Sequence, residues 1–114
     1  MIIRHFSNKE YSFHLKLGQI KALEKETNIG YYALYELLNF GKHSIDHILL
    51  ILRLGLVGGG MESNEANTLV QKEVASQPFF TYVELARATL HNAIFGGDEV
   101  TTISEGKLET QTKS

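Results

Sequence analysis

The run SIDHILLILRLGLV, residues 44–57, decides the fold. Apolar side chains recur in it at the i, i+3, i+4 and i+7 spacing of one α-helical face, and further leucines and isoleucines widen that face. Ser44 stands directly before the apolar residues, and a serine hydroxyl there can accept a hydrogen bond from an amide of the first helical turn. The run predicts a helix over residues 45–57 that is apolar nearly all round and therefore lies at the centre of the domain.

Four further helices are predicted around this central one. Their ranges are 18–27, 31–40, 64–76 and a last helix from Pro78 to the terminating Gly96-Gly97. Ser63 is the expected cap of the helix over 64–76, and Pro78 suits the first position of the last helix. Gly58-Gly59-Gly60 is expected to form a flexible break between the central helix and the next one.

Two strands are predicted before the helices. Residues 11–17 (YSFHLKL) alternate apolar and polar side chains, which is the period-two signature of a strand with one buried face. Residues 2–6 form a second apolar stretch, and the turn signal Ser7-Asn8 between the two predicts a β-hairpin. A lone hairpin is marginal in water, so its apolar face must rest on the helices or on a neighbouring subunit.

The residues after Gly97 differ in composition from the rest of the chain. They are mostly polar and lack apolar periodicity, which predicts a disordered tail over residues 98–114. The sequence therefore predicts a mainly α fold, with about five helices in a compact bundle and an N-terminal β-hairpin. We expect a single helical domain over residues 1–97, followed by the tail.

Composition excludes several classes of function. The chain has 114 residues and a formal net charge of −2, and its 11 basic residues are scattered rather than gathered into the stripe typical of nucleic-acid binders. It contains no cysteine, which rules out disulfides and thiolate metal sites and suits a reducing cytoplasm. No apolar run is long enough for a signal peptide or a membrane span, so no membrane partner is expected.

No pattern of catalytic, cofactor-binding or metal-binding residues stands out. His43 and His47 have the spacing of two helical metal ligands, but the only carboxylate nearby is Asp46 and a closed site needs about four ligands. No histidine has a serine or cysteine partner at a recognisable spacing for nucleophilic catalysis. The Gly58–Gly60 triplet follows a helix rather than a strand and lacks a following Lys-Ser/Thr, so it does not read as a phosphate loop. We expect no enzyme activity and no cofactor.

Aromatic side chains on the helix over 31–40 are the candidate protein-binding residues. They are Tyr31, Tyr32, Tyr35 and Phe40. Tyr31 and Tyr32 are adjacent and cannot point in the same direction, so at least one should reach the surface. Exposed tyrosine is enriched at interfaces because it combines a large contact area with a polar tip.

Four segments together resemble a family of short proteins from tailed phages and gene transfer agents, grouped with the tail assembly chaperones. The segments are LGQIKALEKETNIG (17–30), SIDHILLILRLGLVGGG (44–60), EANTLVQKEVA (65–75) and ELARATLHNAIFGG (84–97). The residues that carry the resemblance are Leu17, Leu23, Glu24, Gly30, Ile48, Leu52, Gly55-Leu56, Leu69-Val70, Leu90 and Phe95-Gly96. The resemblance covers residues 11–97, and the chain departs from the family in its glycine triplet and its polar tail.

The resemblance implies a function in tail morphogenesis. Such proteins are made in the bacterial cytoplasm from a prophage or gene-transfer-agent cluster. They are thought to coat the long, apolar tape-measure protein and keep it soluble while tube subunits polymerise around it. The implied partners are the tape-measure protein or another tail protein, and a second copy of the chain itself.

Two alternatives to the chaperone remain. The first is a structural component of the tail, and some descriptions of the family call its members tail tube proteins; the helical prediction argues against a tube subunit, because tail tubes are built from β-rich rings. The second is a small helix-turn-helix regulator that uses the helices over 31–40 and 45–57. A recognition helix must present polar side chains to the DNA groove, and the helix over 45–57 is too apolar for that.

Overall fold

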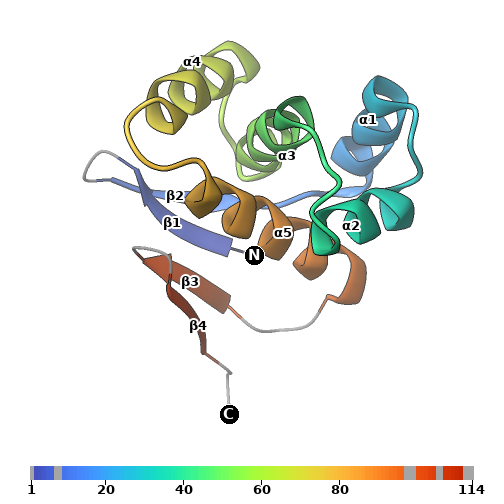
Figure 1. The fold of residues 1–114 in the computed structure, drawn as a ribbon. Coiled ribbons are helices and arrows are strands. Elements are labelled where there is room, and N and C mark those ends of the chain that lie inside the picture. The colour runs from blue at the N-terminus through green and yellow to red at the C-terminus, as the bar shows by residue number, and fades with distance from the viewer. Residues whose placement is uncertain (1, 7–8, 97–99, 105–106, 112–114) are drawn as a thin grey trace.

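The computed structural model describes residues 2–6, 9–96, 100–104 and 107–111. Five helices and four strands follow one another along these residues (Figure 1). In chain order they are β1 (Ile2–Phe6), β2 (Lys9–Phe13), α1 (Leu17–Thr27), α2 (Tyr31–Asn39), α3 (Ile45–Gly58), α4 (Ser63–Val74), α5 (Phe80–Phe95), β3 (Val100–Ser104) and β4 (Lys107–Gln111). The prediction of a mainly α fold with five helices and an N-terminal hairpin is confirmed.

The four strands form one mixed sheet in the order β2-β1-β3-β4. β1 pairs antiparallel with β2 and parallel with β3, and β3 pairs antiparallel with β4. The helices lie on one side of this sheet, with α5 passing over β1, while the β3–β4 hairpin extends away from the helices (Figure 1). The helical layer therefore rests mainly on the N-terminal hairpin.

α3 is the central helix, as the sequence predicts. It packs against α1, α4, α5 and β2, and no water reaches its side chains Ile48, Ile51 and Leu52. Ile45, in contrast, is exposed in the first turn, so the apolar ladder becomes buried only from the second turn onward.

Capping interactions fix where the helices begin. Ser44 Oγ accepts from the amide of His47 at 3.1 Å, and the ring Nδ1 of His47 accepts from the amide of Ser44 at 3.0 Å. This reciprocal pair satisfies two amides that the helix cannot pair internally, and it confirms the predicted cap. The start of α4 differs from the prediction, because the carboxylate of Glu62 rather than Ser63 caps it, accepting from the amide of Asn64 at 2.6 Å.

The start of α5 also differs from the prediction. The helix begins at Phe80, two residues after Pro78, although the amide of Thr81 still donates to the Pro78 carbonyl at 3.3 Å. Pro78 thus belongs to the turn that leads into the helix.

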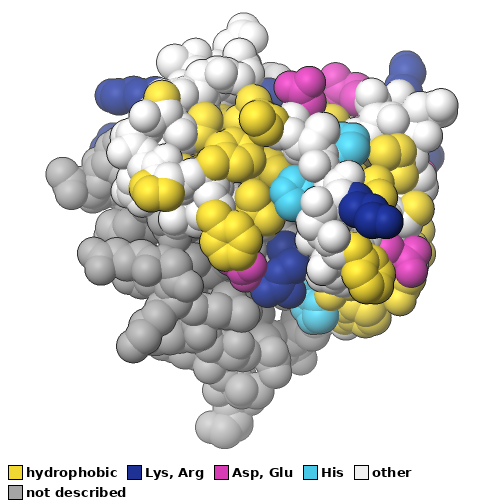
Figure 2. All heavy atoms as spheres, viewed as in Figure 1, with side chains coloured by type: hydrophobic (Ala, Val, Ile, Leu, Met, Phe, Trp, Pro, Cys, Tyr) yellow, Lys and Arg dark blue, Asp and Glu magenta, His cyan; other side chains and the backbone are white. Residues whose placement is uncertain are grey.

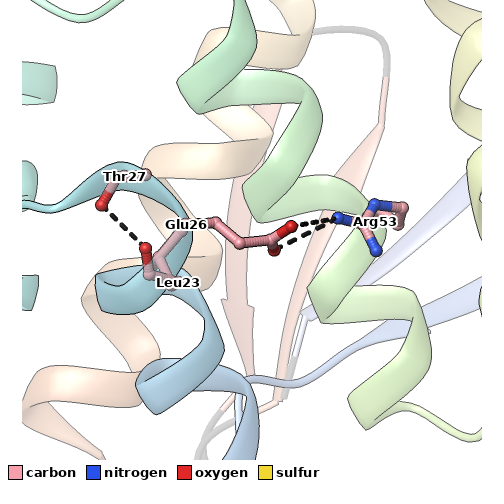
Figure 3. Close-up of polar contacts among 4 residues, drawn as sticks. All are labelled: Leu23, Glu26, Thr27 and Arg53. Atoms are coloured by element: carbon pink, nitrogen blue, oxygen red, sulfur yellow. Dashed lines mark hydrogen bonds and ion pairs between the residues drawn. The ribbon is translucent and has the colours of Figure 1, made fainter.

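α1 is held against α3 by packing and by an exposed ion pair. Leu23 is fully buried, and Arg53 Nη2 of α3 lies 3.3 Å from Glu26 Oε2 of α1 (Figure 3). The hydroxyl of Thr27 donates to the carbonyl of Leu23 at 2.7 Å and closes the last turn of α1 (Figure 3). Since both charged side chains of the ion pair are partly in water, we expect it to contribute less than about 1 kcal/mol, so Leu23 carries the contact.

The glycines at the end of α3 serve close packing, which corrects the expected flexible break. α3 continues through Gly58, and a Cβ atom at Gly58 would overlap the carbonyl oxygen of His14. A Cβ atom at Gly59 would likewise overlap the carbonyl oxygen of Ser12. The amide of His14 donates to the carbonyl of Gly55 at 2.9 Å, which ties α3 to the chain that leaves β2.

The C-terminal residues differ from the expected disordered tail. β3 and β4 form a hairpin over most of this segment, and β3 adds to the edge of β1. Val100-Thr101-Thr102-Ile103 is a run of four β-branched residues, which favour strands over helices and coil. Residues 98–99, 105–106 and 112–114 of the expected tail lie outside the described residues.

Candidate protein-binding surface

α2 presents its side chains on an outer edge of the helical layer, next to α5. Its first turn is fixed by α1, because the carboxylate of Glu24 accepts from the amide of Tyr31 at 2.9 Å. Gly30 precedes the helix in an extended conformation and lets the chain reverse direction between the two helices. The fold thereby sets the direction in which the aromatic side chains of α2 project.

Five rings from α2 and α5 form a continuous α2–α5 aromatic cluster. The members are Tyr31, Tyr32, Tyr35, His91 and Phe95. The centroid of Tyr32 lies 6.4 Å from that of Tyr31 and 6.1 Å from that of Tyr35, both in edge-to-face arrangements. Tyr35 contacts Phe95 in the same way at 5.8 Å, and Phe95 lies 4.7 Å from His91. Each such ring pair contributes about 0.5–1.5 kcal/mol beyond the free energy of burying its apolar surface, so the pairs stabilise the arrangement of the cluster.

The cluster has a buried anchor and an exposed rim. Tyr31 and Tyr32 are 42% and 48% exposed, and Phe95 is 56% exposed. Tyr35 is only 8% exposed, and its hydroxyl shares a hydrogen bond with Nδ1 of His91. Both adjacent tyrosines therefore reach the surface, whereas the ring of Tyr35 is buried beneath them.

Phe40 lies at the opposite end of α2, beside a shallow groove. It is 72% exposed. The groove has a volume of about 390 Å³ and is lined by Ile29, Ala33, Glu36, Leu37, Phe40 and Lys42. Its walls are apolar, while Glu36 and Lys42 bring one charge of each sign to the lining. We name Tyr31, Tyr32, Phe40 and this groove the α2 surface.

Hydrophobic side chains also gather elsewhere on the molecule. Figure 2 shows one group over the region where α3, α4 and α5 meet, and another over α2. Phe80, at the start of α5, is 69% exposed, which makes it comparable to Phe40 in exposure but separate from α2.

The positions of the histidine, acidic and buried polar side chains bear on metal and catalytic chemistry. Among the described residues, no three His, Asp or Glu side chains come close enough to hold a metal ion. The buried polar pair on α4 and α5 is structural in character, because the Tyr82 hydroxyl donates to the Glu73 carbonyl at 2.9 Å and lies 3.3 Å from its carboxylate. In the part of the chain that the structure describes, no helix is long and apolar enough to cross a membrane.

The sequence prediction did not include two members of the α2–α5 aromatic cluster, His91 and Phe95. They lie four residues apart on α5, the spacing of neighbours on one helical face. That spacing was a usable signal for a shared surface, but only the packing of α5 on α2 shows that these rings meet Tyr35.

A family model described as "Phage tail tube protein, GTA-gp10" matches residues 3–96. No curated protein and no solved structure matches the chain. The family match spans most of the chain and confirms the predicted resemblance. The chain belongs to this phage and gene-transfer-agent tail family, which is a family of tail proteins rather than a known class of enzymes.

Proposed function

We propose, starting from membership of this tail family, that the chain is a non-enzymatic tail assembly chaperone that binds the tape-measure protein. The observation that carries the proposal is the α2 surface, where Tyr31, Tyr32 and Phe40 stand exposed on one short helix. Large exposed aromatic side chains are unfavourable in water unless a partner covers them, and at interfaces they are the residues that most often dominate the binding energy.

The chemistry of the α2 surface fits an apolar helical segment. The groove beside Phe40 offers apolar walls from Ile29, Ala33 and Leu37, into which the side chains of a partner helix can insert. Glu36 and Lys42 can pair with polar groups that flank such a segment. The tyrosines at the other end of α2 accept either apolar or hydrogen-bonding contacts. A long apolar tape-measure chain, covered in this way by many copies, would stay soluble during tail assembly.

The fold supports a chaperone over a tube subunit. Tail tubes are built from β-rich rings, whereas the described residues of this chain form five helices and one small sheet. The family is nevertheless described as one of tail tube proteins, and this favours a structural tail component as the second candidate.

The packing of α3 argues against the DNA-binding alternative. α3 would have to serve as the recognition helix, but it is enclosed by α1, α4, α5 and β2. A helix in that position cannot enter a DNA groove.

Co-expression with the tape-measure protein of the same gene cluster tests the chaperone proposal. We expect the wild-type chain to raise the soluble fraction of the tape-measure protein and to be recovered with it. Tyr32→Ala and Phe40→Ala should each weaken the complex by about 2 kcal/mol, roughly thirtyfold in affinity, because each removes an exposed aromatic anchor.

Phe80→Ala is the matched control, because it removes an equally exposed aromatic side chain that lies off α2. Equal solubility of the tape-measure protein with and without this chain, and no recovered complex, would contradict the chaperone. Stoichiometric presence of the chain in purified, mature particles would favour the structural component instead.

A further inference from the structure

Within the described residues, the edge of β1 that faces away from β2 pairs only with β3 of the C-terminal hairpin. β3 pairs with β1 through Ile2↔Thr101, Ile3↔Thr102 and Arg4↔Ile103, a shorter register than the five pairs that join β1 to β2. Neither β3 nor β4 packs against a helix to more than a slight extent within the described residues. Figure 1 shows the hairpin projecting away from the helical layer. The hairpin is therefore attached to the body through one edge of one strand.

The family match ends where the helical body ends. It covers residues 3–96, and β3 begins at Val100. Among the residues whose burial the structure describes, the buried apolar side chains come from β1, β2, the five helices and the segment between β2 and α1. The hairpin thus lies outside the part of the chain that the family model matches.

The residue content of the strands matches their places in the sheet. The outer strands, β2 (KEYSF) and β4 (KLETQ), each begin with lysine and carry a glutamate. Such charges discourage edge-to-edge association of exposed strands. β1 (IIRHF) has one charged residue, Arg4, and β3 (VTTIS) has none. β1 therefore has fewer of the charges that protect an exposed edge strand than β2 and β4 have.

We propose that the hairpin β3–β4 is a cap that keeps the edge of β1 from pairing with the β1 edge of a second copy of this chain. Without the cap, one row of β1 amide and carbonyl groups loses its partners, and an identical row on another molecule can satisfy it by antiparallel pairing. Such a contact is two-fold symmetric and closes as a dimer with a continuous β2-β1-β1-β2 sheet. The proposal concerns self-association and is independent of the tape-measure partner.

A double proline substitution in the full chain releases the cap. Successive residues of a strand direct their amides to opposite neighbours, so Thr101→Pro with Thr102→Pro removes a donor toward β1 and one toward β4. Thr101→Val with Thr102→Val is the matched control, because it keeps both amides and the β-branched shape. Light scattering coupled to gel filtration gives the mass of each variant over a range of concentrations, and circular dichroism reports whether the helical body is intact.

We expect the proline variant to keep its helices and to form a species of twice the wild-type mass, while the valine variant keeps the wild-type mass. A synthetic peptide spanning residues 97–114 should return the proline variant to the wild-type mass, and a scrambled peptide should not. An unchanged mass in the proline variant at all concentrations would overturn the proposal. Loss of the helical signal in that variant would also overturn it, because the hairpin would then be an integral part of the body.

Discussion

A Cβ atom added to Gly58 would overlap the carbonyl oxygen of His14. The backbone of the last turn of α3 therefore packs directly against the backbone of the chain that follows β2. The amide of His14 donates to the Gly55 carbonyl one turn earlier, at 2.9 Å. This contact joins the central helix to the sheet without intervening side chains. Glycine at position 58 is thus a requirement of the layer packing.

Gly58→Ala should destabilise the protein by about 3 kcal/mol, the upper end of the range for overpacking, because the obstructing atom is backbone. Gly18→Ala is the matched control, since a Cβ atom there has no neighbour within 4 Å. Alanine at position 18 should be neutral or stabilise α1 by up to about 1 kcal/mol. Urea denaturation of both variants measures the two effects, and equal midpoints would contradict the packing role of Gly58.

Leu52→Ala should cost about 2–5 kcal/mol of unfolding free energy, the usual range for truncating a fully enclosed leucine. Leu49→Ala should cost less, because Leu49 is only partly buried and some of its surface stays in water in the folded state. Thermal melts of the two variants rank them directly. A larger loss at Leu49 than at Leu52 would mean that α3 is rotated from the orientation described.

Tyr35→Ala should destabilise the fold by about 3–5 kcal/mol, as expected for a buried aromatic side chain. Tyr32→Ala should cost less than about 1 kcal/mol, because its ring is largely at the surface. Tyr35→Phe isolates the hydroxyl bonded to His91 and should cost about 1 kcal/mol. Denaturation curves for the three variants distinguish Tyr35, which supports the α2 surface from beneath, from Tyr32, which forms part of that surface. Similar stability of the Tyr35→Ala and Tyr32→Ala variants would contradict the distinction.

His14 should make stability depend on pH. Burial lowers the pKa of His14 below its ordinary value of 6.5, and the positive charges of the amino terminus and Lys16 lower it further. The unfolded chain therefore binds the proton more tightly than the folded chain does. The contribution of His14 to the free energy of unfolding is fully present above about pH 6.5, and it is lost as the pH falls through the lower pKa of the folded state.

His14→Gln should flatten that part of the pH profile. The remaining histidines are common to both proteins, so the difference between their unfolding free energies at pH 5 and pH 8 reports His14. A wild-type protein that loses no more stability than the variant on acidification would contradict the assignment.

Local patterns in the sequence were sufficient to predict the positions of the helices. The ladder in α3 and the serine before it depend on neighbours within one or two turns, and both predictions are confirmed. The end of α1 was also predictable, because asparagine readily adopts the left-handed conformation that commonly terminates a helix. Asn28 adopts this conformation in the structure. The cap of α4 was misplaced by one residue because Glu62 and Ser63 can both accept from a first-turn amide.

Features that depend on distant residues could not be predicted. Tyr35 is buried because α5 brings His91 and Phe95 against it, and nothing within α2 signals that contact. The glycine triplet resembles a flexible linker in sequence, and the packing role of Gly58 and Gly59 emerges only when β2 and the residue after it lie beside α3. β3 is short and largely polar, and its pairing with β1 depends on a strand from the other end of the chain.

Because Ile2 pairs with Thr101, the sheet joins a strand that is synthesised early to one that is synthesised late. Almost the entire domain lies between these two residues, so on a translating ribosome β1 is exposed long before β3 has been synthesised. The helices can fold against β1 and β2 during that interval, whereas closing so long a loop is among the slowest steps available to a small domain. Every newly made copy therefore passes through a stage in which its first strand is open to its neighbours on the same polysome.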